Sequence, residues 1–142
     1  MSVMVHAADG VETEQAVVPE IEFVQAPPGM MDLRTYGLHQ LDDEGLLFAM
    51  RSVQHPDIRL FLVPPQVYFP EYEPRLDAET RLALGLGDES PLVLVVVHPG
   101  GAGDAPTANL LAPVVINTST GSALQVVLDS DEWPLRAQFR AA

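Results

Sequence analysis

Short stretches in which polar and apolar residues alternate recur along the chain, with turn residues between them. Residues 20–24 and 36–41 alternate cleanly, and residues 46–50 and 58–63 are apolar-rich stretches that follow polar turns. Apolar residues at every second position are typical of a strand with one buried face. The pattern therefore predicts a meander of short strands in the first half of the chain.

The second half of the chain contains its most apolar stretch. Residues 92–97 read LVLVVV, and such a short continuous run predicts a central strand that is buried on both faces. Residues 112–116 and 123–128 then form a predicted hairpin. In its loop, residues 117–122, Gly121 can supply the positive φ that a hairpin loop often needs.

Two segments between these strands have a different pattern. Residues 67–74 read VYFPEYEP, which is aromatic but twice interrupted by proline. Because proline removes a ladder donor, we expect an edge strand or an irregular strand here. Residues 78–84 favour a short helix, with Asp77 as its N-cap and Gly85 at its C-terminal end.

Seven or eight short strands and one short helix predict a mostly β protein, built as a small antiparallel β-barrel or sandwich. The length of 142 residues fits one domain. Residues 1–18 mix small residues with carboxylates and show no clean period, so we expect a flexible acidic leader there. Residues 19–140 then form a single β domain, in which residues 99–106 are a glycine-rich loop.

Charge is the compositional feature that changes this picture most. Twenty Asp and Glu residues against seven basic residues give a formal net charge of −13, and all seven basic residues are arginine. An acidic surface repels nucleic-acid phosphate, so we expect no direct binding to nucleic acid. Two explanations of the charge stay open: it serves solubility, or it forms a surface that meets a basic partner.

Composition also excludes several kinds of chemistry. The chain has no lysine for a Schiff base or a Walker-type loop, and no cysteine for a thiolate nucleophile or metal ligand. Its first residues have no secretory signal pattern, and no apolar run approaches the ~20 residues of a membrane span. We therefore expect a cytoplasmic protein that does not bind membranes.

No pattern nominates a catalytic or metal-binding residue. The four histidines are scattered without ligand spacing, and the glycines of residues 99–103 are not followed by the GK[ST] of a phosphate loop. Asp129, Asp131 and Glu132 begin like a calcium loop, but the residues after them do not supply its further oxygen ligands. We expect no enzyme, no cofactor and no metal.

Four aromatic residues lie in unusual surroundings. Tyr68, Phe69 and Tyr72 stand among prolines, and Trp133 precedes Pro134. These rings can close the open ends of a small barrel, because scarce aromatic residues are most often core residues. They can also form a patch that faces a partner, because Tyr and Trp are enriched in binding hot spots. Both interpretations stay open.

Two asparagines stand in apolar surroundings where loops become strands. Asn109 precedes the predicted hairpin and Asn117 begins its loop. Asparagine side chains at such positions commonly bond to nearby backbone groups. We therefore expect both residues to have a structural role.

Several motifs together resemble the FliW family of bacterial flagellar assembly factors. They are TANLLAPVVIN at residues 107–117, QVVL at 125–128, WPLR at 133–136, FPEYE at 69–73, and HPDI at 55–58 followed by FLV at 61–63. The resemblance runs from about residue 19 to residue 139. Two places depart from the family pattern: residues 23–30 lack a glycine and a phenylalanine of its opening motif, and residues 118–125 carry no charge where family members are often basic.

The resemblance implies a non-enzymatic regulatory binding protein that is a monomer when free. Family members bind the translational repressor CsrA, which relieves repression of flagellin mRNA, and they bind flagellin. Partner switching between the two couples flagellin synthesis to flagellar assembly. A different class of function also stays open, namely a small β-barrel that binds or processes a small molecule beneath the loop of residues 99–106.

The candidate site residues fall into two groups. Those expected to contact partners are Tyr68, Phe69, Glu71, Tyr72, Asp129, Asp131, Glu132 and Trp133; those expected to be structural are Asn109, Leu110, Pro113, Asn117 and Gly121. Within the first group, we assign the acidic residues to the basic repressor. We assign the aromatic residues to flagellin, whose terminal segments are amphipathic helices.

Overall fold

The computed structural model describes residues 15–27, 30, 32–100, 103–128 and 133–139, with the backbone alone for residues 15–19. Most of the predicted leader, residues 1–14, lies outside the described residues. The elements are β1 (Gln15–Phe23), β2 (Thr35–Gln40), β3 (Phe48–Ser52), β4 (Arg59–Val63), α1 (Pro65–Tyr68), α2 (Ala78–Leu84), β5 (Leu92–His98), β6 (Thr107–Ala108), β7 (Val114–Ile116), β8 (Ser122–Gln125) and β9 (Ala137–Gln138).

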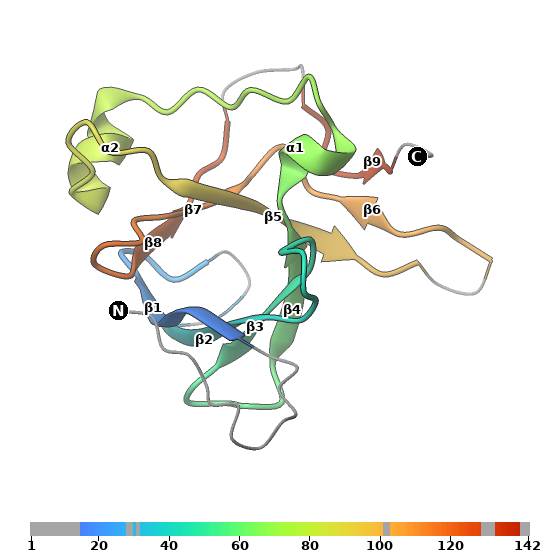
Figure 1. Ribbon diagram of the computed structural model, residues 1–142, viewed down its shortest axis with the longest axis horizontal. Helices are drawn as coiled ribbons and strands as arrows, with labels where there is room; N and C mark the ends of the chain where they lie inside the picture. Colours follow the sequence, from blue (N-terminus) through green and yellow to red (C-terminus); the bar gives the residue numbers. More distant parts are fainter. Residues whose placement is uncertain (1–14, 28–29, 31, 101–102, 129–132, 140–142) are drawn as a thin grey trace.

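Within the described residues, seven of the strands form a closed barrel. Their order is β4-β3-β2-β1-β8-β7-β5, and a further pairing of β4 with β5 closes the ring. Neighbouring strands are antiparallel except β1 and β8, which run parallel through only two residue pairs. The sheet continues beyond the barrel through β6 and β9 (Figure 1). The predicted mostly β fold is confirmed, and of its two forms the molecule has the barrel.

The inward-facing residues of the alternating strands fill the barrel. Tyr36, Leu38, Leu62 and Leu94 are each 0 % exposed. The Tyr36 hydroxyl donates to the carbonyl oxygen of Leu33 at 3.1 Å, which satisfies the polar end of this buried ring. Among the described residues, these inward-facing side chains pack against one another in a single cluster, and a filled interior argues against the small-molecule alternative.

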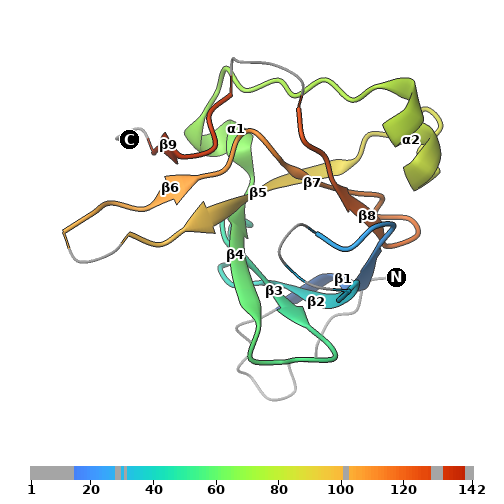
Figure 2. The same cartoon turned by 180° about the vertical axis from the view of Figure 1, so that it is seen from behind.

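A second apolar cluster lies outside the barrel wall. Val63 of β4 and Val95 of β5 point outward and pack with Phe69, Tyr72 and Leu110. The segment after α1 and strand β9 cover this part of the wall (Figure 2). A third cluster joins Leu84 and Leu86, at the end of α2, to Val115 of β7. The apolar run of β5 therefore has cover on both faces, which explains why it does not alternate.

The predicted helix α2 is confirmed, together with both of its caps. The Asp77 carboxylate accepts a hydrogen bond from the backbone N–H of Thr80 at 2.9 Å. Gly85 ends the helix with a φ of 66°, in the left-handed region. Among the described residues, no helix is long and apolar enough to cross a membrane.

Two sequence predictions about elements are wrong, and the short strands β6 and β9 were not predicted. Strand β1 begins at Gln15 and not at residue 20, because its first residues pair with Gln40 and His39 of β2. The predicted strand at residues 67–74 is helix α1 followed by irregular chain, so there are two helices and not one. Pro65 presets the first helical turn, and the Phe69 N–H donates to the Pro65 carbonyl at 2.7 Å. Strands β6 and β9 have two residues each, too few to show a period.

Candidate functional site

A surface groove lies over the second apolar cluster and brings several of the predicted contact residues together. It is lined by Phe69, Glu71, Tyr72, Leu110, Trp133, Pro134, Arg136, Ala137 and Gln138, with a volume of about 380 Å³. We call it the Trp133 groove. Its residues come from the chain after α1, the chain after β6, and β9 with the residues before it. The fold thus gathers four predicted contact residues with one residue of the predicted structural group.

The chain after α1 is held in place by two consecutive turns. The Phe69 N–H closes the turn of α1, and the Tyr72 N–H then donates to the Phe69 carbonyl at 2.9 Å. These turns direct the Phe69 and Tyr72 rings onto Val63 and Val95 of the barrel wall. Prolines in this segment limit its backbone freedom, which favours one fixed path along the groove.

Tyr72 forms the floor of the groove. Its side chain is 1 % exposed, and its hydroxyl donates to the Leu110 carbonyl at 2.7 Å. Burial raises the pKa of this phenol above its ordinary value, so the side chain stays neutral. The Tyr72 ring meets Trp133 edge to face, with 4.7 Å between ring centroids. Trp133, which is half-buried, is therefore seated on a rigid base.

The aromatic residues predicted to face a partner have different surroundings. Phe69 and Tyr72 are buried, whereas Tyr68 and Trp133 are half-buried. The rings of Tyr68 and Phe69 both contact Phe139, at centroid distances of 5.1 and 5.5 Å. The interpretation of Phe69 and Tyr72 as an exposed patch is wrong, because both rings cover the barrel wall. Whether the surface above them binds a partner stays a prediction.

Asn109 and Asn117 both bond to the backbone, as a structural role requires. The Asn109 side-chain oxygen accepts from the N–H groups of Leu111 and Ala112 at 3.1 and 3.0 Å. These bonds set the turn that leads past Pro113 into β7. Leu110 lies in this turn, where its carbonyl accepts from Tyr72. The first asparagine thus shapes one wall of the Trp133 groove.

Asn117 connects the β7–β8 hairpin to helix α2. Its side-chain oxygen accepts from the Ser119 N–H at 2.9 Å, and its side-chain nitrogen donates to the Leu84 carbonyl at 2.8 Å. The Asn117 backbone carbonyl accepts from Gly121 at 2.7 Å, where φ is 85°. The sequence predicted bonds within the loop but did not predict the contact with Leu84, which lies 33 residues earlier.

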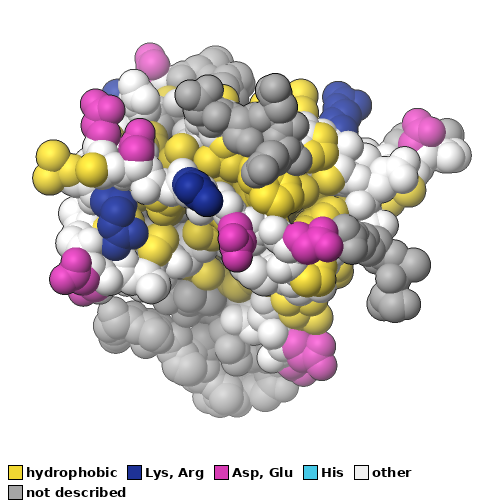
Figure 3. Space-filling model, turned by 90° about the horizontal axis from the view of Figure 1, so that it is seen from above, with side chains coloured by type: hydrophobic (Ala, Val, Ile, Leu, Met, Phe, Trp, Pro, Cys, Tyr) yellow, Lys and Arg dark blue, Asp and Glu magenta, His cyan; other side chains and the backbone are white. Residues whose placement is uncertain are grey.

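Only one of the four acidic residues that were predicted to contact a partner lies within the described residues. Asp129, Asp131 and Glu132 lie outside the described residues, and Glu71 is exposed at the edge of the groove. Seen from above, apolar side chains gather on one face, with acidic and arginine side chains set around them (Figure 3). A partner with both apolar and charged groups would match such a surface.

A smaller, polar hollow lies on the other side of Arg136 and Gln138. It has a volume of about 260 Å³ and is also lined by His98, Pro99, Gly100, Asp104, Ala105 and Thr107. The Nε2 atom of His98 is buried there without a hydrogen-bond partner. Among the described residues, no group of three His, Asp or Glu side chains is arranged to hold a metal ion. Sequence reasoning missed the position of Arg136 between the two hollows, because β9 is too short to predict.

Comparison with known proteins places the chain beside one group of relatives. The model of the family described as "FliW protein" matches residues 5–139. "Flagellar assembly factor FliW" of Syntrophotalea carbinolica is 33% identical over 117 residues, which are 80% of this chain and 81% of the relative. The protein of the same name from Desulfitobacterium hafniense is 33% identical over 118 residues, 82% of this chain and 77% of the relative.

A solved structure agrees with these relatives. The "crystal structure of the flagellar assembly factor FliW" superposes with a TM-score of 0.76 at 27% sequence identity. The match covers 98% of this chain and 91% of the other.

Proposed function

The chain belongs to the FliW family, and on that premise we propose that it is a non-enzymatic regulator that binds both the translational repressor CsrA and flagellin. Binding to CsrA relieves repression of flagellin mRNA, and flagellin competes for the same regulator. The free flagellin pool then controls flagellin synthesis. The observation that carries this proposal is the family match, which extends over residues 5–139.

The charge of the chain supports binding to an RNA-binding protein. CsrA presents a basic surface to RNA, and this chain has a formal net charge of −13. An acidic body bound beside that surface opposes RNA phosphates within a Debye length of about 8 Å at physiological salt. By linkage, bound RNA must lower the affinity of CsrA for this chain by the same factor by which this chain lowers the affinity of CsrA for RNA. We assign this contact to the acidic segment of Asp129, Asp131 and Glu132.

The Trp133 groove supports binding to an amphipathic segment, and we assign flagellin to it. Half-buried Trp133 and buried Leu110 supply apolar surface, while Glu71 and Arg136 supply opposite charges at its edge. A flagellin terminal helix would place apolar residues in the groove and polar residues against the edge. Because Tyr72 fixes the indole ring in place, little ordering of the groove is needed on binding.

Calorimetric titration with the cognate CsrA at two salt concentrations tests the first contact. We expect a saturable complex whose affinity falls as the salt concentration rises, because complementary charges are screened. Asp131→Asn should weaken binding and reduce the salt dependence. Glu79→Gln, which removes one carboxylate from exposed helix α2, is the matched control. Absence of binding to both CsrA and flagellin would overturn the proposal.

Replacing Trp133 with alanine tests the second contact. Truncation of a central aromatic anchor typically costs about 2 kcal/mol or more, so we expect flagellin affinity to fall roughly 30-fold. Leu135→Ala is the control, since Leu135 is 50 % exposed and does not line the groove. Melting temperatures of both variants separate loss of binding from loss of stability. Equal flagellin affinities for the two variants would place flagellin elsewhere.

A further inference from the structure

A second surface groove, larger than the Trp133 groove, lies beside helix α2. It has a volume of about 520 Å³, within the range that is typical of ligand sites. Its residues come from α1 and the chain after it, from α2 and from the start of β5. They are Gln66, Pro70, Tyr72, Glu73, Pro74, Leu76, Arg81, Pro91 and Val93. We call this surface the Arg81 groove.

The walls of the Arg81 groove are largely apolar and have little conformational freedom. Pro70, Pro74 and Pro91 line it, and proline fixes the backbone φ angle. Leu76 packs against the third apolar cluster, and Val93 belongs to the ladder of β5 with β7. The groove is therefore formed before a partner arrives, so binding requires little ordering of its walls.

Arg81 is the cationic residue of this groove, and hydrogen bonds fix its orientation. The Nε and Nη2 atoms donate to the Gly87 carbonyl at 3.3 and 2.7 Å, and Nη2 also donates to the Glu89 carbonyl at 2.8 Å. These bonds attach the guanidinium group to the turn that follows α2. Among the described residues, the Nη1 atom makes no hydrogen bond. The N–H donors of Nη1 are therefore available to a ligand.

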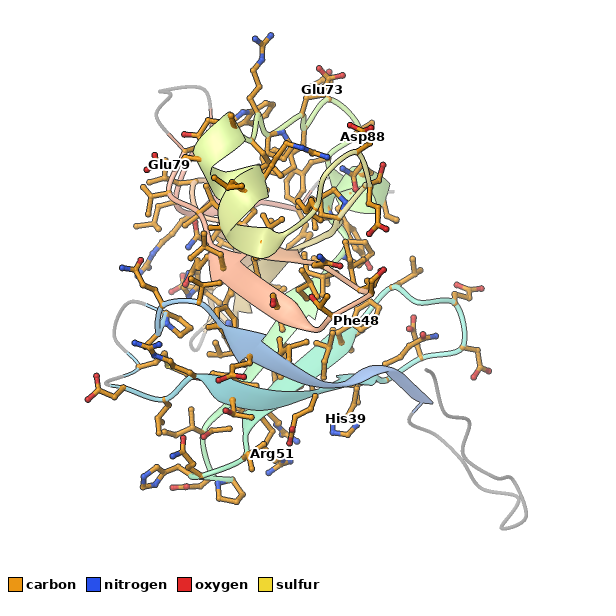
Figure 4. The ribbon with its side chains drawn as sticks, turned by 90° about the vertical axis from the view of Figure 1, so that its left-hand side faces the viewer. His39, Phe48, Arg51, Glu73, Glu79 and Asp88 are labelled. Atoms are coloured by element: carbon orange, nitrogen blue, oxygen red, sulfur yellow. The ribbon has the colours of Figure 1, made fainter. Side chains whose placement is uncertain are left out.

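No carboxylate neutralises Arg81 in the part of the chain that the structure describes. Its hydrogen bonds go to carbonyl oxygens, and Glu73, which lines the same groove, forms no ion pair with it. Glu73 and Asp88 project outward at the end of the molecule that carries α2 (Figure 4), and both side chains are exposed. Glu73 thus lies at the solvent rim of the groove, and the charge of Arg81 is left for a ligand.

We propose that the Arg81 groove binds a peptide segment of a partner protein in which one acidic residue stands beside a large apolar residue. The acidic side chain accepts hydrogen bonds from Nη1 of Arg81, and the apolar side chain packs on Leu76 and Val93. Hydrogen bonds between a guanidinium group and a carboxylate are roughly twice as strong as neutral ones. At the rim, Glu73 repels a second carboxylate, so the groove selects segments with a single acidic residue.

This inference does not depend on the function proposed above, because the two grooves have different linings. Phe69 and Glu71 line the Trp133 groove, Pro70 and Pro74 line the Arg81 groove, and Tyr72 lines both. The same short segment therefore contributes to two surfaces of different chemistry. Loss of binding at one of them can be measured without reference to the other.

Titration of the full chain with short peptides, followed by two-dimensional amide NMR, tests the inference. The probes are the N-acetylated and C-amidated tripeptides leucine-glutamate-leucine and leucine-glutamine-leucine, which differ in the charge of the central side chain. We expect the acidic peptide to shift the amide signals of Leu76, Arg81 and Val93. It should bind roughly tenfold more tightly than the neutral peptide, because a hydrogen bond to a charged group contributes more than a neutral one.

Three variants separate the role of Arg81 from general electrostatics. Arg81→Gln should abolish the difference between the two peptides. Arg75→Gln removes the same charge from an exposed residue that does not line the groove, and it should keep the difference. Because Arg81→Gln also changes the bonds to the turn after α2, its melting temperature is measured as well. Glu73→Gln leaves those bonds intact and should tighten binding of the acidic peptide roughly twofold.

Two results would overturn the inference. One is an equal affinity of the unsubstituted chain for both peptides, or no shift of the groove signals with either. The other is tighter binding of leucine-lysine-leucine than of leucine-glutamate-leucine, which would mean that Glu73 and the net charge of −13 select a cation. Neither result bears on the titrations with CsrA and flagellin, which test the proposed function by themselves.

Discussion

Individual polar side chains hold separate parts of the chain together. The Tyr72 hydroxyl joins the chain after α1 to the turn before β7 through Leu110. The Asn117 amide joins the β7–β8 hairpin to the end of α2 through Leu84. Each bond is buried, where an unpaired partner costs more than the bond itself contributes. These side chains therefore determine how elements far apart in sequence lie against one another.

Replacing Asn117 with leucine tests this role. Leucine has a similar size but leaves the Leu84 carbonyl and the Ser119 N–H without the bonds that they make now. We expect the free energy of unfolding to fall by about 2–4 kcal/mol, with unchanged CsrA binding at low temperature. Thr118→Leu at the exposed neighbouring position should change it by less than about 0.5 kcal/mol. Lost CsrA binding at an unchanged melting temperature would show that Asn117 is a contact residue.

At the scale of elements, helix α2 depends on its cap and on its packing. Helix α2 has 7 residues, too few to be stable alone in water. Its packing against β7 and the Asp77 cap both contribute to its stability. The hydrogen bond from the Thr80 backbone lowers the pKa of Asp77 below its ordinary value. A depressed carboxyl pKa means that the ionised cap stabilises the folded state.

The Asp77 cap should make stability depend on pH in a defined direction. Its contribution is fully present above the ordinary Asp pKa of about 3.9 and is lost as the pH falls through the lower folded-state pKa. We expect Asp77→Ala to lower the melting temperature at pH 7, by an amount that shrinks as the solution is acidified. Asp77→Asn, which caps without charge, should lose less stability and show little dependence on pH. Thermal denaturation of the three proteins between pH 7 and about pH 3 measures both effects.

At the scale of the whole molecule, the charge imbalance acts on the fold. Seven arginines can neutralise at most seven of the twenty carboxylates, so repulsion among the remainder opposes the compact state. We expect the melting temperature at neutral pH to rise between about 0.01 and 0.3 M sodium chloride, where the Debye length shortens from about 30 to 6 Å. Calorimetric scans over this range measure the change. A lower melting temperature in high salt would mean that attractive ion pairs outweigh the repulsion.

Much of the fold follows from local sequence, and little of the candidate site does. Alternation placed β2 and part of β1, because a strand with one buried face needs an apolar residue at every second position. Apolar runs between turn residues placed β4 and the β7–β8 hairpin, although β8 ends at Gln125 and not at residue 128. The Asp77 and Gly85 caps located α2 for a similarly local reason. Helix α1 was missed because its four residues include a proline and two β-formers, and its turn depends on backbone bonds and not on a period.

The Trp133 groove could not be assembled from the sequence. Its residues come from three segments separated along the chain. The family motifs contain several of these residues, but the motifs do not show which residues lie together in space. The burial of Phe69 and Tyr72 could not be predicted either, because the sequence pattern of an aromatic residue among prolines is the same whether the ring is buried or exposed.

By itself, the sequence determined the properties that depend on composition and on neighbours along the chain: short strands, a capped helix, a strongly acidic molecule, no thiol or lysine chemistry, and the family motifs. Tertiary structure alone decided which strands close the barrel, which aromatic rings are buried, and which side chains share the groove. The physical reason is that ladder pairing and packing join residues at large separation. Their energies depend on register and distance in space, which no local period encodes.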